Sequence, residues 1–573
     1  MKKKIMPVLV VIVLILLIIG GVLAVSLIKK YTPSKERKEL SEYYNLTSAD
    51  QVALIYNYEV LDTTALLLDG SVYLDYNFVH DFINPRFYWD ANENILLYTT
   101  ADELISASAD STSYLVTKSS VEYGKPIVKA SSTSAWVEID FVRQYSDFTY
   151  TYYQDPSRIV LNNNWGEINV ANIKKKNTSV RELGGIKSPI LCDLTKGDKV
   201  VVLEELEKWV KVQTQDGVIG YVRSNAVSNP TVENLASDFV PETFTHIVKD
   251  FEICMAWHQV TTRDANSTLT NVLADTKGIN VISPTWFYLN DNNGGIANLA
   301  SNDYVNYCHQ QGIEVWALVS NLENPDVDTT YVLTHTSTRQ NLVNQIISVA
   351  IQYNLDGINL DFEALDREQV GDSYIQFIRE LSIKCANNGI VLSVDNYAPT
   401  EYTAFYNRAE QANFVDYVVI MGYDEHYGGS EEAGSVASIS WVRDAVVNTL
   451  EEVPASQVVL GMPFYTRIWC TTPDADASDT EMSYKVTSKA YGMRAANVQI
   501  ATYDAEKTWN AECGQNYAEY MVGDSKYQVW LEDSSSAEER LKLLDEYSLA
   551  GASFWKLGFE TSDIWDTIIK YIN

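Results

Sequence analysis

Residues 356–363 read DGINLDFE, and this short stretch decides the fold of the C-terminal half of the chain. Apolar and polar side chains alternate along it with the period of a β-strand, and the polar positions are Asn359, Asp361 and Glu363. Two acids and an amide therefore share one face of a strand whose other face is apolar. Burying such groups without partners is costly, so packing alone does not explain them.

The stretch is one of a series of apolar segments between residues 244 and 573 that alternate with helical segments. This order predicts a parallel β/α architecture. The gap before the last segment is about twice an ordinary crossover, so we expect a small strand-rich subdomain inserted at 466–533. Residues 244–573 suffice for a (β/α)8 (TIM) barrel with that insertion. The eight candidate strands are 246–253, 279–287, 313–319, 357–363, 390–396, 417–423, 457–464 and 552–557.

In such a barrel the apolar face of the strand packs against the surrounding helices, and the polar face enters the barrel interior. Glu363 is then nearest to the C-terminal mouth, where the active sites of these barrels lie. The pattern predicts an active site on this strand, with Glu363 and Asp361 as its catalytic candidates.

The stretch resembles the DGxDxDxE signature of glycoside hydrolase family 18, the chitinase and chitinase-like family. The signature is matched at Asp356, Gly357, Asp361 and Glu363, whereas Asn359 stands where the family usually has aspartate. An asparagine donates hydrogen bonds but takes no charge, so we expect the pH dependence of this chain to differ from the family pattern.

Further motifs follow in the order that the family shows. Residues 421–424 (MGYD) resemble its MxYD motif at the sixth strand, and residues 460–465 (LGMPFY) resemble its LGxPxY motif at the seventh. Trp555 falls where the family has a tryptophan that lines the floor of the sugar site. The C-terminal segment 527–560 looks closest to the branch that contains bacterial spore-germination and cell-wall N-acetylglucosaminidases. The resemblance covers residues 244–573.

The resemblance implies a role for each matched residue. Glu363 would be the general acid and then the base, while the 2-acetamido group of the substrate replaces an enzyme nucleophile. Asp361 would hold the acetamido N–H and raise the pKa of Glu363 by like-charge repulsion. Tyr423 would bond the acetamido oxygen, Asp424 a nearby sugar group, and Trp555 would stack under the sugar. The remaining candidate substrate-binding residues are Asn359 and Met421, and Asp356 would fix the entry of the strand.

The N-terminal half reads as two small β domains. Residues 46–165 hold short alternating runs, and 72–100 resemble the stalk-type domain named after the N-terminal region of copper amine oxidases, a name that implies no copper. Residues 166–229 predict a small barrel with an Asp216-Gly217 hairpin. This barrel resembles the bacterial Src-homology-3 (SH3) domain, whose members often bind cell-wall peptides; a spacer without a ligand is the alternative. The linkers are 31–45 and 230–243.

The N-terminus predicts a membrane segment. Residues 5–28 carry no charge, and this uncharged run is longer than the roughly 20 residues that a membrane helix needs. Lys2, Lys3 and Lys4 precede them, so residues 1–30 would be a single-pass anchor that leaves 31–573 outside the cytoplasm. The alternative is a signal peptide cleaved near residues 22–24, which releases a secreted protein.

Composition excludes several classes of function. A net charge of −33 makes the protein a poor ligand for nucleic acid. The surplus of aromatic residues, 37 Tyr and 13 Trp, suits stacking on sugars, although this signal is weak on its own. The sequence has neither CxxC nor HExxH spacing, so we expect no metal and no cofactor. Cys470 and Cys513 could pair, although free buried thiols are the favoured interpretation.

The sequence therefore predicts an extracellular, membrane-anchored hydrolase that cuts peptidoglycan after N-acetylglucosamine. One alternative is a chitinase that acts on chitin oligomers. Another is a chitinase-like glycan-binding wall protein without activity, against which the presence of Glu363 argues.

Overall fold

The computed structural model describes residues 5–131, 134–473 and 484–572. They form two compact units. The first comprises Met1–Trp89, Ala107–Tyr114 and Ser120–Pro241, and the second Asp90–Ser106, Leu115–Ser119 and Glu242–Asn573. Lys2, Lys3 and Lys4, on which the orientation of the N-terminal segment was argued, lie outside the described residues.

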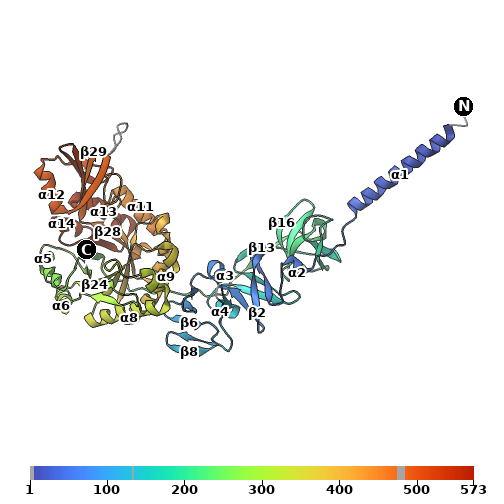
Figure 1. The fold of residues 1–573 in the computed structure, drawn as a ribbon, viewed down its shortest axis with the longest axis horizontal. Helices are drawn as coiled ribbons and strands as arrows, with labels where there is room; N and C mark the ends of the chain where they lie inside the picture. The colour runs from blue at the N-terminus through green and yellow to red at the C-terminus, as the bar shows by residue number, and fades with distance from the viewer. Residues whose placement is uncertain (1–4, 132–133, 474–483, 573) are drawn as a thin grey trace. The chain divides into compact units, whose positions relative to one another are not determined.

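The second unit contains a closed barrel of eight parallel strands, which confirms the predicted fold class (Figure 1). Neighbouring strands pair in the order β21-β20-β34-β28-β27-β26-β25-β24, and a further parallel pairing of β21 with β24 closes the cylinder. The strands are β20 (Ile253–His258), β21 (Val281–Pro284), β24 (Glu314–Ser320), β25 (Gly357–Asp361), β26 (Val391–Tyr397), β27 (Tyr417–Met421), β28 (Val458–Pro463) and β34 (Gly551–Trp555).

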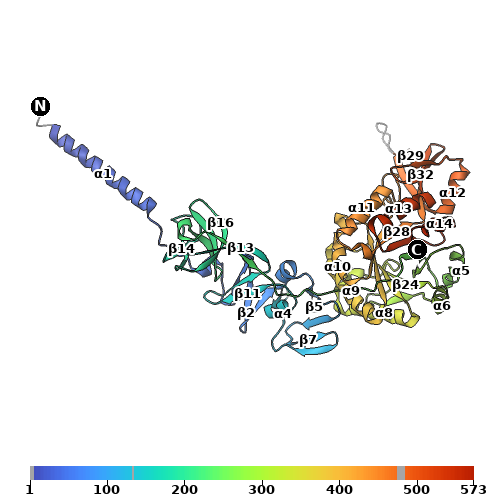
Figure 2. The same cartoon turned by 180° about the vertical axis from the view of Figure 1, so that it is seen from behind.

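Helices surround the barrel and bury the outward faces of its strands in one apolar core. Figures 1 and 2 show α8 and α9 on the side of β24, and α11 and α13 on the side of β28. The main helices are α6 (Asn302–Gln310), α8 (Thr336–Tyr353), α9 (Arg367–Asn388), α10 (Arg408–Phe414), α11 (Ile439–Leu450) and α13 (Ser534–Tyr547), with the short helices α5 (Leu269–Val272), α7 (Thr329–Thr334) and α14 (Ile564–Ile568).

The prediction for the first barrel strand is wrong, because β20 occupies Ile253–His258 and not 246–253. The preceding segment crosses the bottom of the barrel instead. The Ile247 N–H donates to Asp416 Oδ1 at 2.6 Å, and the Lys249 N–H donates to the Tyr417 hydroxyl at 2.9 Å. Ile247 and Phe251 of this segment pack against the apolar cluster inside the barrel. Because the segment is apolar like a buried strand, hydrophobicity alone did not distinguish it from one.

The lower half of the barrel interior is filled by large apolar side chains, among them Met255, Trp316 and Val419. A Cβ on Gly357 would lie 2.6 Å from the Trp316 ring, so glycine is required at the entry of β25. The polar face of β25 ends above this filled region, near the C-terminal mouth.

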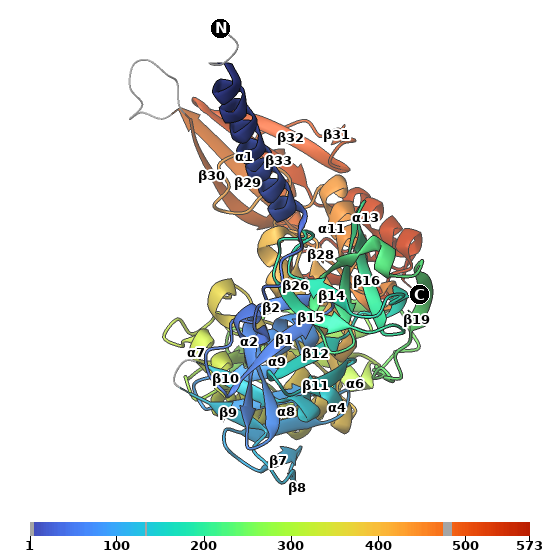
Figure 3. The same cartoon turned by 90° about the vertical axis from the view of Figure 1, so that its right-hand side faces the viewer.

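A strand-rich subdomain is inserted between β28 and β34, as predicted (Figure 3). Its antiparallel sheet has the order β30-β29-β33-β32-β31, and α12 (Met493–Thr502) packs on it. The strands are β29 (Tyr465–Pro473), β30 (Tyr484–Gly492), β31 (Thr508–Asn510), β32 (Gln515–Val522) and β33 (Ser525–Leu531).

Residues 90–106 belong to the barrel unit, although the sequence places them within a separate domain at 46–165. Asp90 accepts hydrogen bonds from the backbone N–H and the hydroxyl of Thr336, both at 2.6 Å, at the start of α8. An acidic side chain is favourable there because helix N-termini carry unpaired N–H groups. Gln376 of α9 donates to Thr99 Oγ1 at 3.1 Å and holds the same segment.

The first unit is β-rich and contains two seven-stranded sheets. One sheet has the order β11-β12-β1-β2-β3-β10-β9, and the other β15-β14-β18-β17-β16-β13-β19. The hairpin predicted at Asp216-Gly217 joins β17 to β18, and Gly217 has a φ of +86°. The strands are β1 (Gln51–Tyr56), β2 (Glu59–Leu68), β3 (Ser71–Asp75), β9 (Val128–Ala130), β10 (Ala135–Glu138), β11 (Thr149–Tyr153), β12 (Arg158–Asn162), β13 (Gly166–Asn172), β14 (Thr178–Arg181), β15 (Ile190–Leu194), β16 (Lys199–Glu205), β17 (Trp209–Thr214), β18 (Ile219–Arg223) and β19 (Thr231–Leu235).

The N-terminal segment is a single helix, α1 (Ile5–Tyr31). Its length and composition suffice to cross a membrane, and its side chains are not buried against the described protein. A signal sequence would meet the same criteria. The six cysteines, all within the described residues, are free thiols, and Cys254, Cys308 and Cys385 are buried.

Candidate active site

The polar face of β25 opens into a cavity of about 190 Å³ at the C-terminal mouth of the barrel. Six of the seven site residues predicted from the sequence line it, and Asn359 is the exception. The parallel register pairs Asn359 with Ser393, so Asp361 lies next to Asp395 on the neighbouring strand. The lining residues are Trp257, Asp361, Glu363, Asp395, Tyr397, Met421, Tyr423, Asp424, Tyr465 and Trp555.

Asn359 is fully buried beneath the cavity and makes four side-chain hydrogen bonds. Its oxygen accepts from Trp257 Nε1 at 2.8 Å and from Ser283 Oγ at 3.0 Å. Its amide nitrogen donates to Asp395 Oδ1 at 2.7 Å and to Ser393 Oγ at 3.2 Å. Asn359 therefore positions Asp395 and the Trp257 ring and does not itself reach a ligand in the cavity.

Asp361 ends β25 and faces the cavity. Its Oδ1 atom is buried and has no hydrogen-bond partner among the described residues. Burial raises the pKa of Asp361 well above its usual range, and the charges of Asp395, Glu363 and Glu323 raise it further. The same burial raises the pKa of Asp395, against which the Asn359 hydrogen bond acts. The two carboxyls titrate together with Glu363 rather than singly.

Glu363 is held through its own backbone by one side chain from the loop after β24. The Glu363 N–H donates to Asn321 Oδ1 at 2.9 Å, and the Glu363 carbonyl accepts from Asn321 Nδ2, also at 2.9 Å. The Tyr397 hydroxyl lies beside the Glu363 carboxyl group in the cavity wall and acts to lower its pKa. These contacts orient the carboxyl group at the mouth of the cavity.

Burial also raises the pKa of Glu363, which favours the protonated form that a general acid needs. The Tyr397 hydroxyl opposes this shift, and the charges of Asp424 and Glu323 add to it. The sequence predicts Asp361 as the source of the shift. Burial is instead the largest cause, because the carboxyl group is enclosed by aromatic side chains at the barrel mouth.

The opposite wall of the cavity is formed by the ends of β27 and β28. Asp424 Oδ1 accepts a hydrogen bond of 2.5 Å from the Tyr465 hydroxyl, and the rings of Tyr423 and Tyr465 meet edge-on with centroids 6.2 Å apart. Trp555 meets Trp257 edge-on at 5.8 Å, which leaves the Trp555 ring as part of the cavity lining.

Two non-glycine residues beside the acids have left-handed backbone conformations. Ala364 has a φ of +51° and Asp424 a φ of +64°. Such conformations cost about 1–3 kcal/mol each and concentrate at functional sites. The chain therefore tolerates local strain where it places these carboxylates.

Sequence reasoning missed four residues that the structure adds to the cavity: Asp395, Tyr397, Tyr465 and Trp257. A signal existed for two of them, because Ser393, Asp395 and Tyr397 repeat along β26 the alternation seen along β25. Tyr465 is the last residue of the seventh-strand motif at 460–465, but no role in the site was predicted for it from the sequence. Trp257 was lost because the first strand was placed too early.

The cavity brings acidic and aromatic side chains together. Among the described residues, no group of three or more His, Cys, Asp or Glu side chains is arranged to hold a metal ion. Carboxylates on one side and aromatic rings on the other define the class of protein: a (β/α)8 barrel with the acid groups of a glycosidase at its mouth.

The chain belongs to glycosyl hydrolases family 18, whose family model matches residues 217–560. The bacterial SH3 domain model matches residues 176–228. These findings confirm the resemblances to glycoside hydrolase family 18 and to the bacterial SH3 domain, whereas the resemblance of residues 72–100 to a stalk-type domain stays a prediction.

Two of the curated relatives come from Bacillus subtilis (strain 168). The chain is 26% identical to the uncharacterized glycosylase YvbX over 327 residues, which span 53% of this chain and 91% of that protein. It is 28% identical to the cortical fragment-lytic enzyme over 266 residues, 44% of this chain and 59% of that protein. The fold is similar to that of the C-terminal domain of a putative chitinase from Desulfitobacterium hafniense DCB-2, with a TM-score of 0.50, 20% identity, and coverage of 56% of this chain and 98% of that one.

Proposed function

We propose that this protein is an extracellular, membrane-anchored glycosidase that cuts β-1,4 bonds after N-acetylglucosamine in peptidoglycan, by substrate-assisted catalysis with retention. The observation that carries the mechanism is the buried, unpartnered Oδ1 of Asp361 in a cavity that Glu363 also lines. A buried acceptor without a donor is costly, and an acetamido N–H would supply that donor.

In the proposed reaction Glu363 donates its proton to the glycosidic oxygen. The acetamido carbonyl oxygen attacks the anomeric carbon, the bond to the leaving sugar breaks, and an oxazolinium ion forms, the known exception to two-carboxylate retention. Asp361 accepts a hydrogen bond from the acetamido N–H and balances the positive charge of the ion. Tyr423 donates a hydrogen bond to the acetamido oxygen. Water then attacks the anomeric carbon, the bond from that carbon to the acetamido oxygen breaks, and Glu363 takes the proton of the water.

The remaining walls bind the sugar. Trp555 stacks beneath the pyranose ring, and Met421 fills the floor beside it. Asp424, which is oriented by the Tyr465 hydroxyl, accepts a hydrogen bond from a hydroxyl of the sugar. Asn359 contributes indirectly, because it fixes Asp395 next to Asp361.

Peptidoglycan is favoured over chitin by two observations outside the site. The chain carries a bacterial SH3 domain, and one of its relatives bears the name cortical fragment-lytic enzyme. The apolar helix α1 supports anchoring at the membrane, with cleavage as a signal peptide as the alternative. In this proposal the SH3 domain binds wall peptides, and residues 46–165 form a stalk of the type named after copper amine oxidases.

The test uses the full chain on purified peptidoglycan and on chitin oligomers. Products are reduced with borohydride and identified by mass spectrometry, and the proposal expects N-acetylglucosaminitol at the new ends of peptidoglycan fragments. The Glu363→Gln variant is the control. Cleavage of chitin alone would make the protein a chitinase, and binding without cleavage by the wild type would make it a glycan-binding wall protein.

A further inference from the structure

A second, larger cavity adjoins the first at the mouth of the barrel. It has a volume of about 530 Å³, against about 190 Å³ for the first, and falls in the usual size range of ligand sites. The two share Glu363, Tyr397, Tyr423 and Asp424. Its other lining residues are Ala364, Leu365, Ala398, Thr400, Tyr402, Thr403, Phe405, Tyr406, Tyr427 and Trp441.

The position of Glu363 identifies what the second cavity receives, provided that the proposed function holds. The first cavity contains Asp361 and Trp555 and takes the sugar whose anomeric carbon reacts. The oxygen that Glu363 protonates joins this sugar to the leaving sugar, so the leaving sugar must also lie against Glu363. Since Glu363 lines both cavities, the leaving sugar extends into the second one.

The wall chemistry of the second cavity is aromatic and acidic. Tyr402 and Tyr427 are 64% and 57% exposed, and they offer ring faces to a ligand at the rim. The charged groups among its described lining residues are Glu363 and Asp424, both acids. Three cations of the described residues lie nearby without lining the cavity. Arg367 lies over the Tyr402 ring at 5.0 Å from its centroid, Arg408 donates to Thr403 Oγ1 at 2.9 Å, and Arg467 lies close to Gly428.

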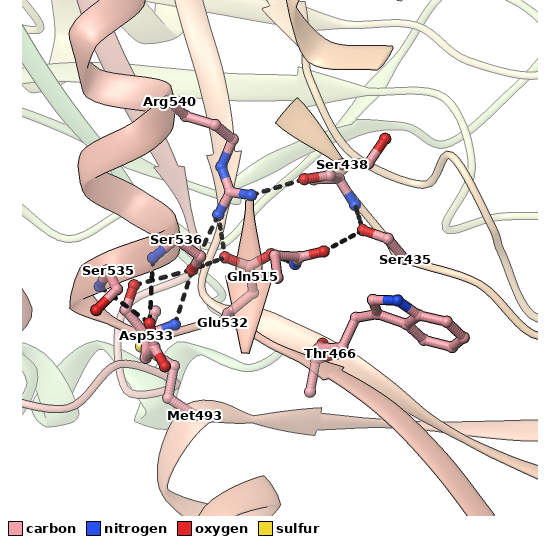
Figure 4. A network of polar contacts seen from close by, with 12 residues as sticks. Ser435, Ser438, Thr466, Met493, Gln515, Glu532, Asp533, Ser535, Ser536 and Arg540 are labelled. Carbon is pink, nitrogen blue, oxygen red and sulfur yellow. Dashed lines mark hydrogen bonds and ion pairs between the residues drawn. The ribbon is translucent and has the colours of Figure 1, made fainter. Parts of the chain in front are cut away.

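The outer wall is a braced loop. The Glu425 N–H donates to the Val436 carbonyl at 2.9 Å, so residues 425–436 form a hairpin that carries Tyr427. At its base the Ser435 hydroxyl donates to Gln515 of the inserted subdomain. The Gln515 amide in turn donates to buried Glu532 at 2.7 Å (Figure 4).

The brace continues into α13. Glu532 pairs with buried Arg540 (Figure 4). Arg540 also donates to the Ala437 carbonyl at 2.7 Å. These contacts with the inserted subdomain hold the base of the 425–436 hairpin in place. The hairpin therefore forms a fixed wall of the second cavity.

We propose that the second cavity binds the leaving sugar together with its 3-O substituent and selects substituents that carry no negative charge. The Asp424 carboxylate in the wall repels a free carboxylate in the low-dielectric cavity. Glu363, which is protonated when the substrate binds, adds no positive charge, and the described lining residues offer no cation to pair with the carboxylate. A 3-O-lactyl group whose carboxyl is in an amide bond is accepted by the ring faces. The volume beyond that of the first cavity provides the room for such a substituent.

The test compares two matched substrates with the full chain. Peptidoglycan strands are stripped of peptide with an amidase, which exposes the lactyl carboxylates, and half are converted to methylamides with carbodiimide and methylamine. We expect kcat/KM on the amidated strands to be at least about tenfold higher than on the free-carboxylate strands at low salt. This ratio should fall at high salt, because salt screens the repulsion. Equal rates, or a preference for the free carboxylate, would overturn the proposal.

Variants at one position isolate the charge effect. Tyr427→Lys and Tyr427→Met lose the same ring and differ in charge, so only the lysine variant should narrow the preference for amidated strands. Tyr484→Lys, at a residue of 56% exposure away from the cavity, should leave the preference unchanged. A preference that shifts equally in the lysine and methionine variants would contradict the electrostatic argument.

An aryl glycoside of di-N-acetylchitobiose separates this inference from the proposed function, since its leaving group has no sugar substituent. If the aryl glycoside is hydrolysed and the amidated and free-carboxylate strands are cut at the same rate, the inference about the second cavity is refuted while the proposed function stands. Failure to hydrolyse any of them, or full activity of Glu363→Gln, would remove the proposed function and the inference with it.

Discussion

Replacing Asn359 by aspartate should move the acidic limb of the activity profile to higher pH. In the wild-type protein the Asn359 amide donates to Asp395 Oδ1 at 2.7 Å and favours the ionised form of Asp395. Asn359→Asp removes that donor and places a third carboxyl group in the buried set with Asp361 and Asp395. The group then retains a proton to higher pH.

The magnitude follows from the lost hydrogen bond. A hydrogen bond to a charged group contributes about 1.5–3 kcal/mol, and one pKa unit corresponds to about 1.4 kcal/mol. We therefore expect the acidic limb to rise by about 1–2 pH units. The two donors on the other side of residue 359, Trp257 Nε1 and Ser283 Oγ, are kept by the variant and favour a fold that stays intact.

The same shift predicts a change of stability with pH. The folded-state pKa of a carboxyl group in this set lies above its unfolded value, so the protonated form is favoured in the folded protein. The stabilisation is then present below the unfolded pKa of about 4 and is lost as the pH rises through the folded pKa. Relative to wild type, Asn359→Asp should lose free energy of unfolding as the pH rises above about 4.

The assay is kcat/KM against pH with a soluble aryl glycoside, for wild type and variant. Ser393→Ala is the matched control, because it removes the weaker contact of the Asn359 amide, at 3.2 Å, without adding charge. Superimposable profiles for wild type and Asn359→Asp would refute the coupling of residue 359 to the carboxyl pair.

Four further outcomes are expected. Glu363→Gln should lower kcat by about 10²–10⁴-fold while glycan binding and the unfolding temperature are kept, and wild-type rates would reject the general acid. Asn321→Ala, which releases the backbone of that acid, should lower kcat by about 10–100-fold with little change in KM for the aryl glycoside. Glu532→Gln should lower the urea-derived free energy of unfolding by about 3 kcal/mol, because it breaks a buried ion pair, whereas Glu539→Gln in an exposed pair should change it by less than about 0.5 kcal/mol. Protease treatment of intact protoplasts should digest residues 31–573, and survival until lysis would reverse the orientation.

The strand period and the order of motifs were enough to predict the barrel, its inserted subdomain and the family. Alternation over 356–363 identifies one inward face, and the end of a barrel strand is where chemistry is placed, so Glu363 and Asp361 were found without coordinates. Their catalytic roles, like those of Tyr423, Asp424 and Trp555, stay predictions until the variants are measured.

Only the tertiary structure decided how these residues are supported. The hydrogen bond from Asn359 to Asp395 depends on the parallel register of β25 with β26. This register pairs Asn359 with Ser393 and places Asp395 Oδ1 2.7 Å from Asn359 Nδ2. Asn321 reaches the Glu363 backbone from a loop 42 residues earlier, and the Ser435–Gln515 bond spans 80 residues. Such contacts carry no local periodic signal, because they arise from strand order and from loop closure at the barrel mouth. The pKa of Glu363 was decided in the same way, since burial, its largest cause, exists only once the surrounding strands are assembled.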